Sequence, residues 1–433
     1  MNHLELVTKG PKGTVDILPP ESKNWILLES ILKSEAELNG FSEARTPLFE
    51  HTELFLRGVG DTTDVVEKQM YTFEDKGGRS ITLRPEGTAG VVRAMLEKGL
   101  YNGGYPIKLY YVASCYRYEK PQKGRLRELH QFGVEVFGAD SPAADAQVIT
   151  LAKSAFDRLG LRNVRLELNS IGCPDCRAKY HNELRRYFEQ YRDRLCGTCL
   201  SRLERNPMRI LDCKSPVCAE IAADAPKIID YICEDCREHF DGVKACLDAI
   251  GIEYTLKPEL VRGLDYYTRT VFEFVSGDIG SQSAIGGGGR YDGLVEELGG
   301  KPTAGLGFGL GLDRIMLVMQ AQGLELPQEG RCELYIAPMG KAAQQKAFQL
   351  VNVLHRCGVS AEFDICGKGL KAQMKYADKI GAKFSLVLGD DEIQGGSAEL
   401  KNMETGEKAA VRIGENFTDD YLQKTTELEG KLL

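Results

Sequence analysis

Hydrophobic and polar positions alternate along this chain with two different periods. Apolar side chains recur at helical spacing over 21–39, and Gly40 follows where the run ends, so a helix is predicted there. Shorter runs rich in β-branched and aromatic residues predict strands at 80–83, 108–118 and 129–138. The last two strands, joined by a polar and basic tip, predict a hairpin with a long connection.

The pattern changes character twice farther along. Residues 161–250 contain helical Arg- and Glu-rich stretches, and eight of the 13 cysteines lie between Cys173 and Cys236. Strands and glycines resume at 262–275, 284–293 and 305–319, so the strand-rich pieces before and after read as one interrupted domain. The predicted boundaries are 1–170 and 251–325 for the discontinuous domain and 171–250 for the cysteine-rich helical insertion.

A polar linker is expected near 325–331, and a separate α/β domain over 331–433. Its strands are predicted at 333–337, 359–363 and 383–388, and its helices at 341–357 and 369–381. Lysines follow one another here at spacings of three and four, which favours either a phosphate-contacting helix face or an ordinary solvated one. These lysines are Lys368, Lys371, Lys375, Lys379 and Lys383.

Length and composition fit an ordinary globular protein of two or three domains. The chain has 433 residues, 42% of them hydrophobic and 27% charged. Its formal net charge of −8 excludes a protein whose whole surface wraps nucleic acid, but it leaves room for a local basic patch. Neither an apolar leader nor a membrane-length apolar run is visible, so we expect a cytoplasmic location, no membrane partner and reduced cysteines.

The predicted hairpin carries the first candidate chemistry. Period 2 places Gln131, Gly133 and Glu135 on one face of the strand and apolar residues on the other. That polar face is either the floor of a ligand site or a solvated outer face. The tip concentrates cations that suit phosphate, or that belong to an ordinary charged loop. These cations are Arg117, Lys120, Lys123, Arg125 and Arg127.

Three later segments add candidates. Arg262 stands with Asp265 and two phenols before a predicted strand, where it could neutralise a carboxylate or phosphate, or be held by Asp265. Glycines at 286–289 permit close approach of a ligand or form a tight bend. Glycines alternate from 305 to 311 and strip one strand face before Asp313 and Arg314. Neither a dinucleotide-binding GxGxxG nor a P-loop motif is present, so any ATP site must be of another type.

The cysteines occur as spaced pairs. Cys173, Cys176, Cys196 and Cys199 form two CxxC pairs at a spacing that is typical of a zinc site. Four further cysteines, at 213, 218, 233 and 236, form a looser second set. The alternative is a helical insertion that simply contains reduced cysteines. Any metal here would be structural, since the pairs offer no open catalytic position.

These segments, in this order, resemble the histidyl-tRNA synthetase family of class II aminoacyl-tRNA synthetases. The matching stretches are TLRPEGTAG (82–90), YRYEKPQKGRLRELHQFGVEVFG (116–138), LVRGLDYYTRTVFEF (260–274), GGGRYDGL (287–294) and GFGLGLDRI (307–315). The RGLDYY stretch is the most specific of them, and Arg45-Thr46-Pro47 resembles the dimer-forming motif more weakly.

The resemblance implies an α+β fold: a class II catalytic domain on an antiparallel sheet flanked by helices, a helical insertion and a C-terminal α/β anticodon-binding domain. It implies a homodimer that uses ATP with Mg²⁺, L-histidine and tRNA(His). The implied reaction forms histidyl-adenylate and pyrophosphate and then charges the tRNA. A structural zinc is left open by the resemblance.

Site roles follow from the resemblance by position. It implies that Glu86 and Thr88 bind the amino group of histidine, that Gln131 orients the substrate, and that Glu135 and Tyr267 read the imidazole. Gly87 and Tyr266 belong to the same histidine-binding set. It implies that Arg117 and Arg262 contact the α-phosphate of ATP as catalytic residues, and that Arg314 contacts the γ-phosphate. Two alternatives remain: a synthetase-like regulatory subunit of ATP phosphoribosyltransferase, and a non-catalytic, zinc-stabilised RNA-binding protein.

Overall fold

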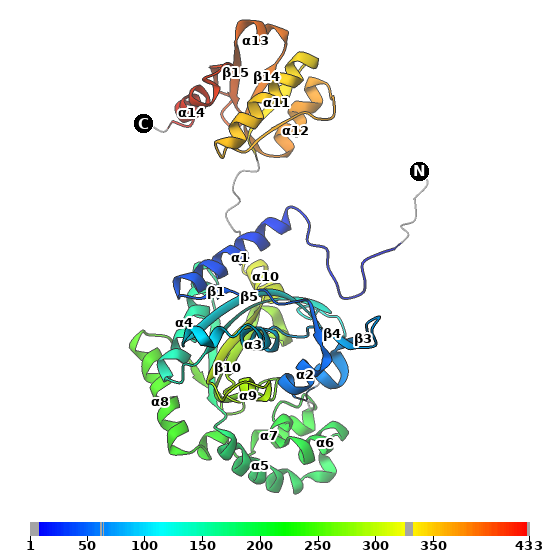
Figure 1. Ribbon diagram of the computed structural model, residues 1–433, viewed down its shortest axis with the longest axis vertical. Helices are drawn as coiled ribbons and strands as arrows, with labels where there is room; N and C mark the ends of the chain where they lie inside the picture. The colour runs from blue at the N-terminus through cyan, green and yellow to red at the C-terminus, as the bar shows by residue number, and fades with distance from the viewer. Residues whose placement is uncertain (1–7, 61–62, 64, 325–331, 431–433) are drawn as a thin grey trace. The chain divides into compact units, whose positions relative to one another are not determined.

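An eight-stranded sheet forms the centre of the N-terminal part of the chain (Figure 1). The computed structural model describes residues 8–60, 63, 65–324 and 332–430, except for the side chains of 281 and 282. The sheet pairs are antiparallel except for the two edge pairs, β1 with β5 and β7 with β8. In sheet order the strands are β1 (Ser42–Glu43), β5 (Ile107–Tyr116), β6 (Glu128–Phe137), β11 (Gly305–Gly311), β10 (Ala284–Arg290), β9 (Thr268–Ser276), β7 (Val164–Ser170) and β8 (Thr255–Leu256).

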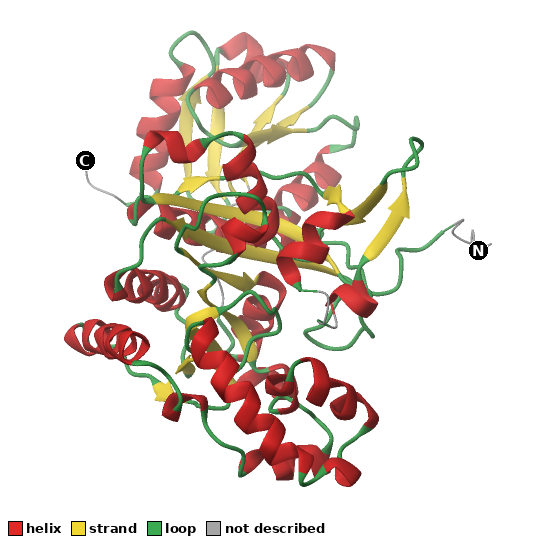
Figure 2. Ribbon diagram, turned by 60° about the horizontal axis from the view of Figure 1, so that its bottom comes forward, coloured by secondary structure: helices red, strands yellow, loops and turns green. Residues whose placement is uncertain are grey.

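Period-2 alternation along β6 divides the two faces of this sheet. Phe132, Val134 and Val136 pack into a core with the first group of helices, whereas Gln131 and Glu135 lie on the opposite face. The predicted polarity of this strand is therefore confirmed. Figure 2 shows helices on both sides of the strands. The first group is α1 (Glu21–Leu38), α4 (Pro142–Arg158) and α10 (Leu312–Ala321); on the opposite face lie α3 (Thr88–Glu97) and α9 (Leu294–Glu297).

A small three-stranded sheet and the insertion complete this unit. The small sheet has the order β2 (Phe49–His51), β4 (Ser80–Leu83), β3 (Tyr71–Glu74), and α2 (Thr52–Val59) follows β2. The insertion lies between β7 and β8 and is helical, as predicted. Its longer helices are α5 (Pro174–Glu189), α6 (Gly197–Arg205), α7 (Pro216–Ala223) and α8 (Glu234–Ala249).

The C-terminal unit has its own sheet and core. The chain divides into two units, Met1–Leu326 and Pro327–Leu433, and the expected linker at 325–331 lies outside the described residues. The predicted alternation of strands and helices is confirmed, but the last two strands run antiparallel, so the sheet is mixed. Its elements are β12 (Cys332–Pro338), α11 (Lys341–Arg356), β13 (Ala361–Phe363), α12 (Leu370–Lys379), β14 (Ala382–Leu388), α13 (Asp390–Gly395), β15 (Ser397–Asn402), β16 (Lys408–Arg412) and α14 (Phe417–Leu428).

Two sequence-based expectations change in the structure. The stretch 305–319 is a strand only to Gly311, because α10 begins at Leu312 and turns the remaining apolar residues into a helix face. The five lysines are all exposed but do not form one helix face, since Lys368 precedes α12 and Lys383 lies on β14. Lys371, Lys375 and Lys379 remain at helical spacing on α12.

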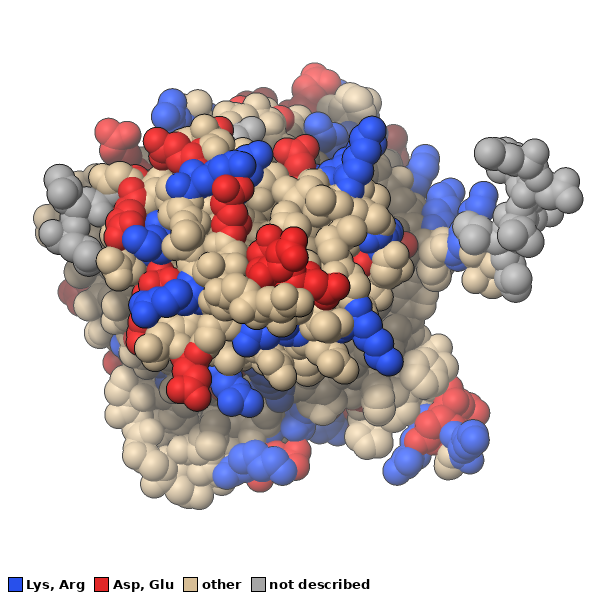
Figure 3. All heavy atoms as spheres, turned by 90° about the horizontal axis from the view of Figure 1, so that it is seen from above, with Lys and Arg blue, Asp and Glu red and all other residues tan. Residues whose placement is uncertain are grey.

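The described residues show mixed surface charge and no helix that could span a membrane, as the composition led us to expect. Positive and negative side chains are interspersed on the face shown in Figure 3, and no single sign covers it. Among the described helices, none combines the length and apolar character needed to cross a membrane.

Candidate active site

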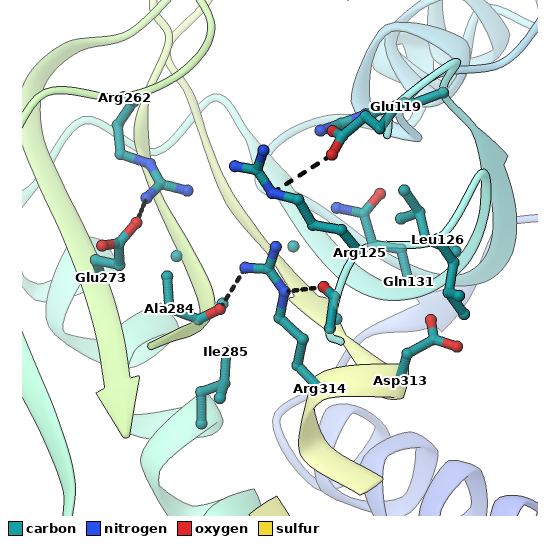
Figure 4. Close-up of a pocket in the computed structure, with 17 residues that line it drawn as sticks. Glu119, Arg125, Leu126, Gln131, Arg262, Glu273, Ala284, Ile285, Asp313 and Arg314 are labelled. Carbon is teal, nitrogen blue, oxygen red and sulfur yellow. Dashed lines mark hydrogen bonds and ion pairs between the residues drawn. The ribbon is translucent and has the colours of Figure 1, made fainter. Parts of the chain in front are cut away.

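A pocket opens on the polar face of the large sheet and is lined by four arginines from three parts of the chain. Arg117 and Arg125 come from the β5–β6 connection, Arg262 from the loop before β9, and Arg314 from the first turn of α10. Figure 4 shows Arg125 and Arg314 extending toward the side of the pocket where Arg262 lies. Gln131 and the glycines of β10 and β11 form its floor.

Arg262 is half-buried and oriented by one carboxylate. It forms an ion pair with Glu273 on β9, and its guanidinium lies 5.9 Å from the centre of the Tyr267 ring. Although burial lowers the pKa of Arg262, the Glu273 carboxylate outweighs burial and raises it, so the side chain stays charged. Among the described residues, its buried Nε atom has no hydrogen-bond partner. A buried donor without a partner is costly, which favours an anionic ligand here.

Arg117 and Arg314 are held through backbone carbonyls, whereas Arg125 pairs with Glu119. The Nε atom of Arg117 donates to the Pro85 carbonyl at 2.8 Å, and the Nε atom of Arg314 donates to the Gly124 carbonyl at 2.9 Å. Burial, and next the neighbouring Arg125 guanidinium, lower the pKa of Arg314. Cations held this close together bind an anion well, because the anion relieves their repulsion.

A buried polar cluster adjoins this pocket. The Glu86 carboxylate accepts hydrogen bonds from the backbone N–H groups of Thr88 and Ala89, at 2.7 and 2.8 Å, at the start of α3. The Thr88 hydroxyl donates to Oε1 of Glu135 at 2.7 Å, and the Tyr291 hydroxyl donates to Oε2 of the same carboxylate. Two carboxylates and several phenols therefore share one enclosed space beside the arginines.

Burial shifts the pKa values of both carboxyl groups upward. It raises the pKa of Glu135 to about 8, helped by the nearby Glu86 charge and opposed by the hydrogen bonds from Tyr291 and Thr88. It also raises the pKa of Glu86, although two backbone N–H groups favour its charged form. Tyr266 and Tyr267 are 7% exposed and belong to the same buried set. Both carboxylates accept hydrogen bonds from neutral donors and form no ion pair among the described residues, which suits a positively charged ligand.

Glycines make room for these side chains. A Cβ atom on Gly307 would lie 2.0 Å from Glu135, and one on Gly309 would lie 1.9 Å from Gln131. A Cβ atom on Gly87 or Gly133 would fall 2.2 Å from ring atoms of Tyr111. The alternating glycines of β11 and the open side of Gly133 therefore accommodate the chain's own side chains. Gly309 and Gly311 also line the open pocket, so this strand serves both purposes.

Comparison with known proteins decides the family. The sequence-family model of histidyl-tRNA synthetase matches residues 13–190 and 217–315 of this chain. The chain belongs to the histidyl-tRNA synthetase family. A curated histidine–tRNA ligase of Acetivibrio thermocellus is 54% identical over 408 residues, which cover 94% of this chain and 98% of that protein. The anticodon-binding domain model matches residues 333–423.

Solved structures agree with the family and show how widely its fold is shared. Apo histidyl-tRNA synthetase of Staphylococcus aureus is 39% identical, covers 95% of this chain and 99% of its own, and gives a TM-score of 0.82. A Bacillus halodurans protein described as an ATP phosphoribosyltransferase regulatory subunit/histidyl-tRNA synthetase gives a TM-score of 0.62 at 23% identity. That second likeness shows a common fold alone.

The structure brings the predicted site residues together as two adjoining groups. Arg117, Gln131, Arg262 and Arg314 line the open pocket, whereas the histidine-specific candidates Glu86, Gly87, Thr88, Glu135, Tyr266 and Tyr267 belong to the buried region beside it. Sequence reasoning did not single out Tyr111 or Glu273. Strand alternation could have indicated Glu273 on β9, but the position of Tyr111 between two glycines depends on strand register.

The insertion's cysteines form two groups that differ from the spacing-based set. Cys173 and Cys176 lie with Cys233 and Cys236, whereas Cys196 and Cys199 lie with Cys213 and Cys218. Cys173, Cys176, Cys196 and Cys199 therefore do not form one site. The reason is geometric: Cys173 precedes α5 and Cys196 follows it, and a helix of 16 residues spans roughly 24 Å.

Proposed function

We propose that this chain is a histidine–tRNA ligase. It activates L-histidine with ATP to histidyl-adenylate and pyrophosphate, then transfers the histidyl group to the 3′ end of tRNA(His). One observation carries this proposal: on one sheet face, an arginine-lined pocket adjoins a buried Glu–Tyr cluster in a chain of the histidyl-tRNA synthetase family. The names of the curated relatives support the same activity.

The buried cluster is the proposed histidine subsite. Glu86, with Gly87 and Thr88, takes the ammonium group, since a carboxylate held by a helix N-terminus is well placed to pair with a cation. Glu135 accepts from one imidazole nitrogen, and Tyr266 and Tyr267 supply phenols for recognition of the ring. A site built to hydrogen-bond both ring nitrogens discriminates strongly against side chains that lack them.

The open pocket is the proposed ATP subsite. Gln131 at its floor orients the histidine carboxylate, whose oxygen attacks the α-phosphorus while the bond to the pyrophosphate oxygen breaks. Arg117 and Arg262 contact the α-phosphate, and Arg314 contacts the γ-phosphate. Attack of an anion on an anion needs such fixed positive charge, which is worth most where negative charge develops. Mg²⁺ accompanies ATP and screens the β- and γ-phosphates.

The remaining parts of the chain follow from this function. We assign 1–170 and 251–325 to catalysis and 171–250 to an insertion, and we assign 331–433 to recognition of the tRNA(His) anticodon. Exposed Lys371, Lys375 and Lys379 on α12 give that unit a phosphate-contacting face. We also propose that the chain acts as a homodimer in the cytoplasm, with the 45–47 segment near the dimer contact.

Histidine-dependent exchange of radiolabelled pyrophosphate into ATP tests the first step, and charging of tRNA(His) tests the second. We expect both with the purified full-length chain and neither when another amino acid replaces histidine. A chain that binds histidine but supports no exchange would be a regulatory relative, such as the alternative named above. The present chain has the complete set of arginines that adenylate formation requires, which argues against that alternative.

A further inference from the structure

Eight cysteines of the insertion form two compact groups of four. In each group all Sγ atoms lie within 4.8 Å of one another, and all eight cysteines are free. Cys173 and Cys176 are 3.5 Å apart, and Cys196 and Cys213 are 3.9 Å apart. A disulfide requires about 2.05 Å. Four thiolates around one zinc, at about 2.3 Å each, stand about 3.7 Å apart. The observed spacing thus fits a central ion.

Helix starts present these thiols to one another. Cys173 and Cys233 immediately precede α5 and α8, and their partners Cys176 and Cys236 follow in the first turns. In the second group, Cys196 and Cys199 stand in the same way at the start of α6, joined by Cys213 and by Cys218 of α7. Positive helix N-termini stabilise thiolates, the form that binds metal.

Backbone donors already point at the sulfur atoms. The N–H group of Cys233 donates to Cys176 Sγ at 3.0 Å, and that of Cys196 donates to Cys218 Sγ at 3.3 Å. Two cysteines of each group are buried and two are half-buried, so each group closes the edge of a small core. Soft thiolate ligands in a set of four select zinc and leave no open coordination position.

We propose that the insertion binds two structural zinc ions, one at Cys173, Cys176, Cys233 and Cys236, the other at Cys196, Cys199, Cys213 and Cys218. Each ion displaces four thiol protons and leaves a net charge of −2 at its site. The second site falls largely in 191–216, the stretch between the two ranges matched by the family model.

Both sites stand next to arginines that hold the proposed histidine-binding loop, 260–267. Arg177 follows Cys176 directly, and its Nη1 atom donates to the Tyr267 carbonyl at 3.0 Å. Arg209 lies between α6 and Cys213, and its Nη2 atom donates to the Gly263 carbonyl at 2.7 Å. The zinc ions therefore hold Arg177 and Arg209 in place, and these two positioning residues in turn hold the loop that carries Arg262 and Tyr267. This consequence, unlike the metal sites themselves, rests on the proposed function.

Metal analysis of double variants tests both the ions and the grouping. The full-length chain, purified without chelator, should contain two zinc ions, as should the control C357S/C366S. C176S/C236S and C199S/C218S should each keep one ion, and C176S/C199S should keep none. If the ligands were grouped by CxxC spacing instead, two of these variants would exchange their results. C176S/C236S would then bind no ion, and C176S/C199S would bind one. That reversed pattern would overturn the assignment of ligands.

A measurement on the wild-type chain guards against variants that fail to fold. Replacement of the metal by Co²⁺ should give the visible d–d bands and thiolate charge-transfer bands of a tetrahedral sulfur site, at two ions per chain. A folded chain that lacks stoichiometric metal, or that contains iron instead of zinc, would refute the proposal.

The link to the active site has its own measurement. Stepwise removal of zinc from the wild-type chain should raise KM for histidine at least tenfold in pyrophosphate exchange, with a much smaller change in KM for ATP. Equal changes in both constants would refute the link. Because metal content needs no activity, two bound zinc ions in a chain without exchange would uphold the sites and refute the proposed function instead.

Discussion

Arg209 of the insertion and Asp265 of the 260–267 loop form an ion pair across the boundary of the two segments. The Asp265 Oδ1 atom accepts from Nη2 of Arg209 at 3.1 Å and from its Nε atom at 3.3 Å, and Asn206 donates to the same oxygen. The arginine side chain is 13% exposed, so solvent screens this contact only in part. The insertion thereby determines where the loop lies.

Arg209→Ala should weaken histidine binding without abolishing catalysis. Loss of the contacts to Asp265 and Gly263 frees the loop, so we expect KM for histidine to rise about tenfold and KM for ATP to change little. Arg209→Lys should recover part of the loss. Arg186→Ala, which removes an exposed ion pair on α5, is the matched control. An effect of the same size in the control would exclude a positioning role for Arg209.

Glu135→Gln should affect the two substrates differently. The amide keeps the shape of the side chain but cannot ionise to pair with a cationic imidazole. We expect at least a tenfold weaker affinity for histidine, measured by calorimetry, and an unchanged affinity for ATP. If both affinities fell equally, Glu135 would not contact the imidazole.

The same variant predicts a pH effect on the ligand-free chain. The pKa of Glu135 in the folded state is about 8, above its ordinary value. Its stabilising contribution is therefore complete below about pH 4.5 and is lost as the pH rises through about 8, on the order of a few kcal/mol. Glu135→Gln lacks this loss. Its Tm should therefore exceed that of the wild type near pH 8 and approach it near pH 5. A difference that does not depend on pH would contradict the prediction.

Arg262→Lys should impair adenylate formation more than the fold. Lysine keeps the positive charge near Glu273 but loses the planar fork and the Nε donor. We expect pyrophosphate exchange to fall about 10²-fold, the size of effect seen when one preorganised transition-state donor is removed. The control is Arg165→Lys. Arg165 lies on β7, next to β9 in the sheet, and its side chain is exposed. An unaltered exchange rate would remove Arg262 from the catalytic machinery.

Local periodicity predicted the parts of the site that depend on one strand or one loop. Gln131 and Glu135 share a face because alternate residues of any strand do. By contrast, the fit of Tyr111 between Gly87 and Gly133 requires the register that pairs Tyr111 with Gly133. That register depends on the conformation of the long connection between β5 and β6, so the pattern within either strand does not specify it.

The cysteines show the same limit, because their spacing identifies the pairs but not which pairs meet. Spacing identified CxxC pairs correctly as units, since residues i and i+3 of a helix start face one way. Which pairs meet depends on how α5, α6 and α8 pack, and this is a tertiary property. Pairs 57 residues apart, such as Cys176 and Cys233, are in contact, whereas Cys176 and Cys196 fall in different groups.

Asp145→Ala should be among the most destabilising single changes in the catalytic unit. Asp145 and Arg290 are fully buried, and Arg290 Nε donates to Asp145 at 2.9 Å. Removal of the carboxylate leaves a buried guanidinium with only its longer ion pair, 3.6 Å, to the partly exposed Asp292, which costs about 3–5 kcal/mol. Asp157→Ala, on the same helix α4, breaks only an exposed pair with Lys153 and should cost about 0–1 kcal/mol. Urea unfolding, followed by fluorescence of the buried Trp25 on α1, measures both. Equal midpoints for the two variants would show that Arg290 finds another partner, and the Ala139 and Ser141 carbonyls that it already contacts are where such compensation would lie.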